Sequence, residues 1–239
     1  RDLHLSIRRQ RQMCIRDSTV RTVRRRAKYI IIELDDGSVL LAHLGMSGRM
    51  YAAPLGREAQ KHDHVEFETE DGTLIVFNDA RRFGMMDLWP AADLDTHRLM
   101  RGLGPEPLDL EFDGPALAKR LKGKATSIKA ALLDQRVVAG LGNIYVSEAL
   151  HHAGISPRRL ARTVQGGRAD RLAAAIRQTL EAAIEAGGSS LRDYVQTSGE
   201  LGYFQHRWVV YEREGKSCRQ CGRACPGIKR IVQAGRSTY

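Results

Sequence analysis

The sequence lacks the features of a membrane-spanning or disulfide-stabilised protein. No apolar run in its 239 residues approaches the ~20 residues that cross a bilayer. The basic N-terminal stretch has no apolar segment of the kind found in secretory signals. Only four cysteines occur, three of them between Cys218 and Cys225, which does not predict a disulfide framework. We therefore expect a cytoplasmic protein whose core is built from the 42% of residues that are hydrophobic.

Positive charge is concentrated at the two ends of the chain. Residues 1–28 carry ten Lys or Arg against two Asp, and residues 205–239 carry eight against two Glu. Since the net charge is +10, the residues between these ends are slightly acidic in sum. Basic ends on an acidic body predict a polyanionic partner, most directly nucleic acid. A soluble basic protein without such a partner is the alternative.

Residues 28–89 have the pattern of antiparallel β structure. Asp36-Gly37 and Asp71-Gly72 each separate two strand-like runs, as in β-hairpins. Beyond a stretch rich in Pro, Gly and Asp the pattern becomes helical, and apolar residues recur every four positions in "RADRLAAAIRQTLEAAIEAGG". We predict an α+β fold with a β-sandwich or barrel over residues 19–92, a linker over 93–114, a helical domain over 115–204 and a hairpin over 205–239.

The stretch "GLGNIYVSEAL" contains the strongest local signal for a ligand. Gly140 and Gly142 permit unusual backbone angles, and Asn143 is a favourable N-cap residue for the helix that follows. A helix N-terminus reached through a glycine turn can bind a phosphate. An ordinary helix–turn–helix connection without a ligand explains the stretch equally well.

Two short loops of the β half suggest contacts with nucleic acid bases. In "HLGMSGRM", Met46 lies between two glycines and could project as an apolar wedge, although a core methionine is the alternative. In "NDARRFGMMDLW", Arg81, Arg82 and Phe83 suit phosphate clamping and base stacking. A solvated turn with Phe83 in the core is the alternative there.

These stretches together resemble the bacterial formamidopyrimidine-DNA glycosylases, also called 8-oxoguanine DNA glycosylases. The resemblance also rests on "RRAKYIIIEL", "KHDHVEF", "LGPEPL", "SIKAALLDQRVVAGLGNIYVSEALHHAGISP", "GYFQHRWVVYEREGKSCRQCG" and "IVQAGRSTY", in family order from about Arg24 to Tyr239. It implies an N-terminal β-sandwich, a helix–two-turn–helix domain and a C-terminal zinc hairpin. It also implies a monomeric base-excision-repair glycosylase with AP lyase activity, which flips oxidised purines out of double-stranded DNA and forms a Schiff base.

The resemblance assigns roles to individual residues of this sequence. Lys28 matches a lysine that assists β-elimination, and Arg236 matches an arginine linked to δ-elimination. The stretch "VQTSGELGYF" matches a flexible loop that covers the flipped base. The DNA-contacting positions are His62, Arg81, Lys124 and Asn143, with Met46, Arg82 and Phe83 filling the gap left by the flipped nucleotide.

A zinc ion is implied by the C-x-x-C pair Cys218 and Cys221. The family holds one zinc with two such pairs, and the second follows a stretch like "QAGRSTYF". We expect weak zinc binding here, because two thiolates, supplemented by Cys225, His206 or water, make a poor structural site.

The first eighteen residues do not resemble the family. The family begins with a proline, whose amine attacks the damaged nucleoside, and an adjacent glutamate, whereas the first proline of this sequence is Pro54. We interpret residues 1–18 as a foreign segment and expect the polypeptide as printed to be inactive in cleavage. The alternatives are an endonuclease VIII-type glycosylase for oxidised pyrimidines, a non-catalytic DNA-binding remnant and an RNA-binding protein.

Overall fold

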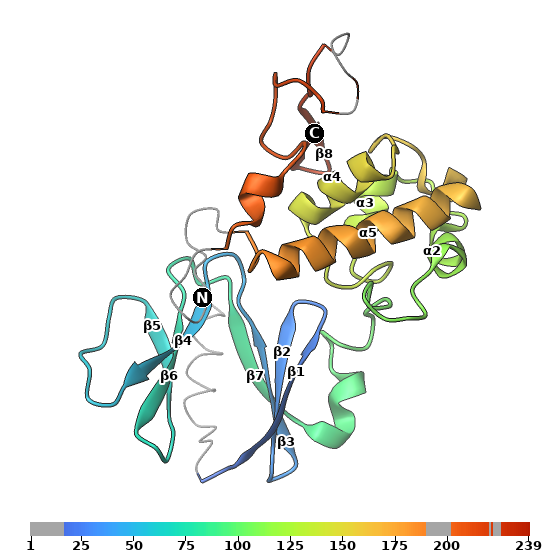
Figure 1. The fold of residues 1–239 in the computed structure, drawn as a ribbon. Helices are drawn as coiled ribbons and strands as arrows, with labels where there is room; N and C mark the ends of the chain where they lie inside the picture. Colours follow the sequence, from blue (N-terminus) through green and yellow to red (C-terminus); the bar gives the residue numbers. More distant parts are fainter. Residues whose placement is uncertain (1–16, 190–201, 220, 222–225) are drawn as a thin grey trace. The chain divides into compact units, whose positions relative to one another are not determined.

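The structure is a computed structural model that describes residues 17–189, 202–219, 221 and 226–239. The chain forms two compact units (Figure 1). The first extends to Arg101, and the second begins at Gly102 and includes the described part of the C-terminal tail. The boundary falls inside the predicted linker 93–114. This stretch does not lie open, because Leu94 and Met100 are buried in the first unit and Phe112 in the second.

The first unit contains two antiparallel sheets, as the hairpin signals predict. One has the strand order β1-β2-β3-β7 and the other the order β4-β6-β5. Gly37 and Gly72 have φ angles of +82° and +78° in the two predicted hairpin turns, a region that L side chains rarely adopt. The strands are β1 (Val20–Arg26), β2 (Tyr29–Leu34), β3 (Ser38–His43), β4 (Arg49–Pro54), β5 (Asp63–Glu68), β6 (Thr73–Asn78) and β7 (Met85–Pro90).

A shared apolar cluster joins these sheets into a sandwich. Leu40 and Met86 come from the first sheet and Phe77 from the second, and all three are buried. Val65 and Phe67 of β5 pack against this cluster, whereas Glu66 and Glu68, which alternate with them, are exposed. The strand therefore alternates between partly buried and exposed side chains, as expected for the face of a sandwich. A short 3₁₀ helix, η1 (Ala91–Thr96), follows the last strand.

The second unit is built from helices around one large apolar core. The helices are α2 (Gly114–Leu121), α3 (Ile128–Leu133), α4 (Asn143–His152), α5 (Gly167–Glu185) and the 3₁₀ turns η2 (Ala161–Thr163) and η3 (Phe204–Arg207). Helix α5 buries Leu172 and Ile176, but Ile184 is exposed. Twelve residues rotate a helix by about 120° beyond full turns, so a strict four-residue repeat leaves the buried face.

The C-terminal tail belongs to the same unit as the helices. It ends in a small hairpin of β8 (Ile231–Gln233) and β9 (Arg236–Thr238). The buried carboxylate of Glu148 in α4 accepts hydrogen bonds from three successive backbone N–H groups, those of Val209, Val210 and Tyr211, at 2.8–3.0 Å. A buried carboxylate needs such partners, and here they fasten the start of the tail to α4.

Candidate nucleic-acid interface

The candidate residues of the first unit lie in four connections between strands. Lys28 is exposed in the turn between β1 and β2, and His62 lies just before β5. Met46, in the β3–β4 loop, is 67% exposed, and Phe83, in the β6–β7 turn, is 57% exposed. These values exclude the alternative that either side chain belongs to the core. Both apolar side chains are therefore exposed on loops of this unit.

The β3–β4 loop and the β6–β7 turn touch through their backbones. A Cβ atom on Gly45 would come within 2.6 Å of the backbone of Phe83 and Gly84, so only glycine permits this approach. The guanidinium of Arg81 stacks over the Phe83 ring, 4.9 Å from its centroid. Met46, Arg81 and Phe83 are thus presented by two adjoining loops, in an arrangement that combines apolar surface with positive charge.

His43 is a neighbour of these loops that the sequence did not single out. Its Nδ1 atom accepts a hydrogen bond from the backbone N–H of Gly45 at 2.9 Å. Burial lowers the pKa of His43, and the charge of Lys28 lowers it further. The imidazole is therefore neutral at pH 7, which suits its role as an acceptor that shapes the Met46 loop. Its only sequence signal is its position just before "LGMSG".

Asn143 lies at the start of α4, but the prediction that it is the N-cap is wrong. Gly142 is the N-cap residue, and Asn143 is the first residue of the helix. Its side-chain amide instead donates to the carbonyl of Ser237 at 3.1 Å and to the hydroxyl of Tyr211 at 3.4 Å. The side chain of Asn143 therefore bonds to the tail, and no side chain caps the start of α4.

Lys129, which no local sequence pattern marks, makes two short hydrogen bonds from the helices to the described part of the tail. It is completely buried in α3, and its Nζ atom donates to the carbonyl of Ser237 and to Oγ1 of Thr238, both at 2.6 Å. Burial, with a further contribution from the charge of Arg236, lowers the pKa of Lys129 to about 8. Both predicted residues of this region, Asn143 and Arg236, therefore adjoin one buried ammonium group.

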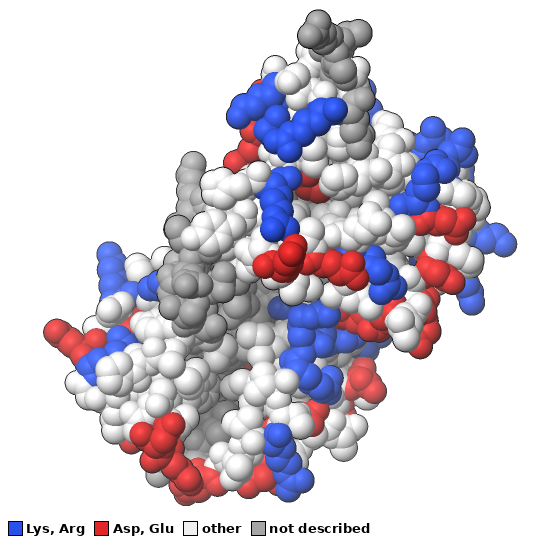
Figure 2. All heavy atoms as spheres, in the orientation of Figure 1, with Lys and Arg blue, Asp and Glu red and all other residues white. Residues whose placement is uncertain are grey.

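Lys124 follows α2 in an ordered turn. The preceding Gly123 has a φ of +75°, and the Lys124 backbone N–H donates to the carbonyl of Leu121. The Lys124 carbonyl accepts from the N–H of Arg162. Lys and Arg side chains also gather on the face of the C-terminal tail that Figure 2 shows.

The described residues do not provide a complete zinc site. Cys218 is buried beside Val210 and Ile228, whereas Cys221 is exposed. In the part of the chain that the structure describes, no group of three His, Cys, Asp or Glu side chains is arranged so that it could hold a metal ion, and structural zinc needs four ligands. Cys225 and most of the loop "VQTSGELGYF" lie outside the described residues. None of the helices in the described part is long and apolar enough to cross a bilayer.

Comparison with known proteins identifies the family. A model of the formamidopyrimidine-DNA glycosylase N-terminal domain matches residues 4–86, including most of the segment 1–18 that the sequence analysis set apart. A model of the helix–two-turn–helix domain of the same glycosylases matches residues 103–195. The formamidopyrimidine-DNA glycosylase of Acidiphilium cryptum is 60% identical over 220 residues, which cover 90% of this chain and 78% of that protein. The chain belongs to the formamidopyrimidine-DNA glycosylase family. The enzyme of the same name from Rhodospirillum rubrum is 56% identical with the same coverage.

Solved structures of the family have the same fold. The MutM (Fpg) protein of Thermus thermophilus is 42% identical, with a TM-score of 0.82, and the match covers 92% of this chain and 80% of that one. The Lactococcus lactis Fpg in complex with DNA containing an abasic site is 33% identical, with a TM-score of 0.86 over 96% and 83% of the two chains. The α+β prediction and the family resemblance are thereby confirmed, and the matches favour the formamidopyrimidine branch over the endonuclease VIII and RNA-binding alternatives.

Proposed function

We propose that the protein recognises oxidised purines in double-stranded DNA, as a DNA glycosylase and AP lyase of base-excision repair. The observation that carries the proposal is the pair of exposed apolar side chains, Met46 and Phe83, on adjoining loops that also carry Arg81 and Arg82. Isolated apolar side chains flanked by cations suit a partner that is both stacked and anionic. The proposed location is the bacterial cytoplasm, where the genomic DNA lies.

Met46 and Phe83 would act by replacing a base that leaves the stack. Extruding a nucleotide costs roughly a few kcal/mol, and a damaged base costs least. Burying one methionine side chain in the vacated space returns about 1.5–3 kcal/mol. The guanidinium of Arg82 adds charge beside the phosphates, so these loops can offset most of the cost of extrusion.

The second unit would hold the DNA backbone. Both amide hydrogens of Asn143 are used by the tail, so the first backbone N–H groups of α4 are the better phosphate donors at this helix start. Lys124 and Arg236 would supply positive charge. Contacts of this kind position the DNA without reading its sequence. His62 would do the same on the first unit.

Lys28 and Arg236 are proposed for strand cleavage after the base has left. Elimination moves a proton from the sugar and expels a phosphate. An exposed lysine amine can exchange protons, whereas a guanidinium stays protonated and instead donates hydrogen bonds to the leaving phosphate. The family resemblance assigns the attacking amine to an N-terminal proline, and none of the described residues is given that role. No step is assigned to zinc, because the described residues supply only the pair Cys218 and Cys221.

Binding measurements with matched variants test the proposal. Fluorescence anisotropy would compare duplexes that contain 8-oxoguanine, an abasic site or no lesion. We expect Met46→Ala to lower the preference for damaged DNA about tenfold while sparing affinity for the intact duplex. Leu55→Ala is the control, since Leu55 is also exposed, at 49%, in another loop of the unit. An unchanged lesion preference in Met46→Ala would contradict the wedge assignment.

A second comparison tests the phosphate contacts. Asn143→Ala should weaken binding to all three duplexes by the same factor, because the start of α4 and the attached tail carry no base information. A selective loss on damaged DNA would instead place Asn143 beside the extruded base and overturn this assignment.

A further inference from the structure

Three loops of the first unit meet at the end of strand β6. They are the Met46 loop (44–48), the His62 loop (57–64, which includes the first two residues of β5) and the turn 80–84 that carries Arg81, Arg82 and Phe83. The residues at the junction are Asn78, which is 8% exposed, and Asp79, which is completely buried. A buried carboxylate is costly unless several donors surround it, so the partners of Asp79 reveal what it holds together.

The Asp79 carboxylate joins the Met46 loop to the turn 80–84. Its Oδ1 atom accepts from the hydroxyl of Ser47 at 2.5 Å and from the N–H of Arg81 at 3.3 Å. Its Oδ2 atom accepts from the N–H of Gly84 at 2.7 Å. The Ser47 hydroxyl accepts in turn from the N–H of Arg81 at 3.1 Å. Burial alone would raise the pKa of Asp79, but these hydrogen bonds outweigh it and lower the pKa.

The backbone of Asp79 extends the connection to the His62 loop. Its N–H donates to the carbonyl of His62 at 3.0 Å, and its carbonyl lies 2.8 Å from Nε2 of His64. The same carbonyl accepts from the N–H of Arg82 at 3.4 Å. One residue therefore contacts all three loops, each of which presents a candidate DNA ligand.

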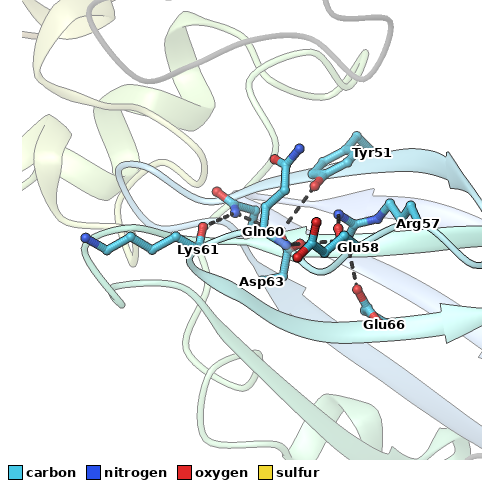
Figure 3. A network of polar contacts seen from close by, with 8 residues as sticks. Tyr51, Arg57, Glu58, Gln60, Lys61, Asp63 and Glu66 are labelled. Carbon is cyan, nitrogen blue, oxygen red and sulfur yellow. Dashed lines mark hydrogen bonds and ion pairs between the residues drawn. The ribbon is translucent and has the colours of Figure 1, made fainter.

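A second network fixes the other side of the His62 loop (Figure 3). The Asn78 amide donates to the carbonyl of Lys61 at 3.1 Å and to Asp63 at 2.8 Å. Asp63 also binds Arg57 at 2.6 Å and the hydroxyl of Tyr51 at 3.2 Å. Burial would raise the pKa of Asp63, but the bonds from Asn78, Arg57 and the backbone lower it to about 2.

Two of the candidate DNA ligands have backbone angles that need such support. His62 has a φ of +76° and Arg82 a φ of +57°, in the left-handed region that disfavours residues other than glycine. Neither conformation would persist in an isolated loop. The backbone N–H of Asp79 bonds to the carbonyl of His62, and the backbone carbonyl of Asp79 accepts from the N–H of Arg82, so both residues are hydrogen-bonded to the same position.

We propose that Asp79 is a positioning residue whose carboxylate holds the Met46 loop and the turn 80–84 as one preformed surface for reading damaged DNA, to which the backbone of Asp79 attaches the His62 loop. Asp79 is buried and does not reach the DNA itself. The inference rests on the proposed function, because it concerns the same DNA-binding residues. Preforming the surface matters because loops that must be ordered during binding weaken it.

The Asp79→Asn variant of the full chain tests the proposal. Asparagine has the same shape but turns an N–H₂ group toward either the Ser47 hydroxyl or the N–H of Gly84, so at least one donor loses its acceptor. We expect the ratio of affinities for 8-oxoguanine and intact duplexes to fall about 10- to 100-fold. Asp71→Asn is the control, since Asp71 accepts from Thr69 and Thr73 in the β5–β6 hairpin turn. It should leave the ratio unchanged.

A double-mutant cycle with Met46→Ala separates positioning from general loss of stability. If Asp79 acts through the Met46 loop, Asp79→Asn should lower the lesion preference much less in the Met46→Ala background than in the wild type. Additive effects, or a wild-type preference in a folded Asp79→Asn protein, would overturn the proposal. A Met46→Ala variant without any effect would instead overturn the proposed wedge.

If Asp79→Asn does not fold, Ser47→Ala tests whether Asp79 couples the Met46 loop to the turn 80–84. It removes the hydroxyl that links Asp79 to the Met46 loop but keeps the carboxylate with Gly84 and Arg81. The lesion preference should fall about tenfold with the melting temperature close to that of Asp71→Asn. An unchanged preference in Ser47→Ala would refute the coupling of the loops through Asp79.

Discussion

Replacing Lys129 by methionine should loosen the Arg236 hairpin without unfolding the helices. Methionine retains the length of the side chain in the core but removes both bonds to the tail, to Ser237 and Thr238. Each hydrogen bond from a charged donor contributes about 1.5–3 kcal/mol. The fall in the pKa of Lys129 from 10.5 to about 8 shows that the charged form is disfavoured in the folded state by about 3 kcal/mol.

These opposing terms predict different results for local and global stability. The two lost bonds would cost about 3–6 kcal/mol and the removed burial cost would return about 3 kcal/mol, so the global free energy of unfolding at pH 7.5 should fall by no more than about 3 kcal/mol. The hairpin itself should open more often, so the amides of Arg236 and Thr238 should exchange with solvent about tenfold faster. Lys119→Met, at an exposed lysine of α2 in the same unit, is the control.

The pH dependence of stability gives an independent check on Lys129. Its pKa is about 8 in the folded protein, below the ordinary value of 10.5. Below pH 8 both states hold the proton and the folded state bears the full cost of the buried charge. Between pH 8 and 10.5 the unfolded state binds more protons, so stability rises with pH.

Urea unfolding of both proteins at two pH values measures this gain. Relative to Lys129→Met, the wild type should gain about 2 kcal/mol between pH 7.5 and pH 9.5. A constant difference between the two proteins would show that Lys129 is not desolvated. Unchanged exchange of the hairpin amides would show that it does not anchor the tail.

Three further changes are expected to have distinct outcomes. Glu148→Gln should lower the free energy of unfolding of the second unit by about 2–4 kcal/mol in urea titrations, since the carboxylate accepts from three buried N–H groups. Gly45→Ala should lower the preference for damaged DNA in anisotropy assays, because the added Cβ would collide with the turn 80–84. Gly37→Ala is the control: its added Cβ meets open space, so the variant should lose only about 1 kcal/mol of stability. Lys124→Ala should reduce the slope of log affinity against log salt by about 1 for every duplex, and exposed Lys122→Ala should change it less.

The fold could be predicted wherever a local pattern decides the structure. The turns at Asp36-Gly37 and Asp71-Gly72 need positive φ at a glycine, so two residues determine each hairpin. Gly187 and Gly188 directly follow the C-cap residue of α5, with φ angles of +69° and +87°, so the helix ends at a local glycine pair. Such features depend on neighbours along the chain and hardly on the rest of the fold.

The site was only partly predictable, because its supports come from distant positions. The sequence identified the loops of Met46 and Phe83 but left their exposure open between two interpretations. Lys129 meets Ser237 across 108 positions, and Asp79 meets Ser47 across 32. Separation along the sequence also explains the wrong prediction at Asn143. The local pattern predicts a helix cap, but the side chain instead donates to Ser237, which is 94 positions away.

In both units one buried charged group supports the exposed residues that we propose for DNA binding. In the first unit the Asp79 carboxylate collects donors from loops that carry Met46 and Arg81, and in the second the Lys129 ammonium collects acceptors beside Arg236. Burying a charged group of this kind costs free energy, and a well-packed apolar side chain in its place would stabilise the fold at least equally. A charge is directional, however, and it fixes the backbone of an exposed loop that has no core of its own. For this reason, neutralising either group should alter DNA binding more than it alters stability.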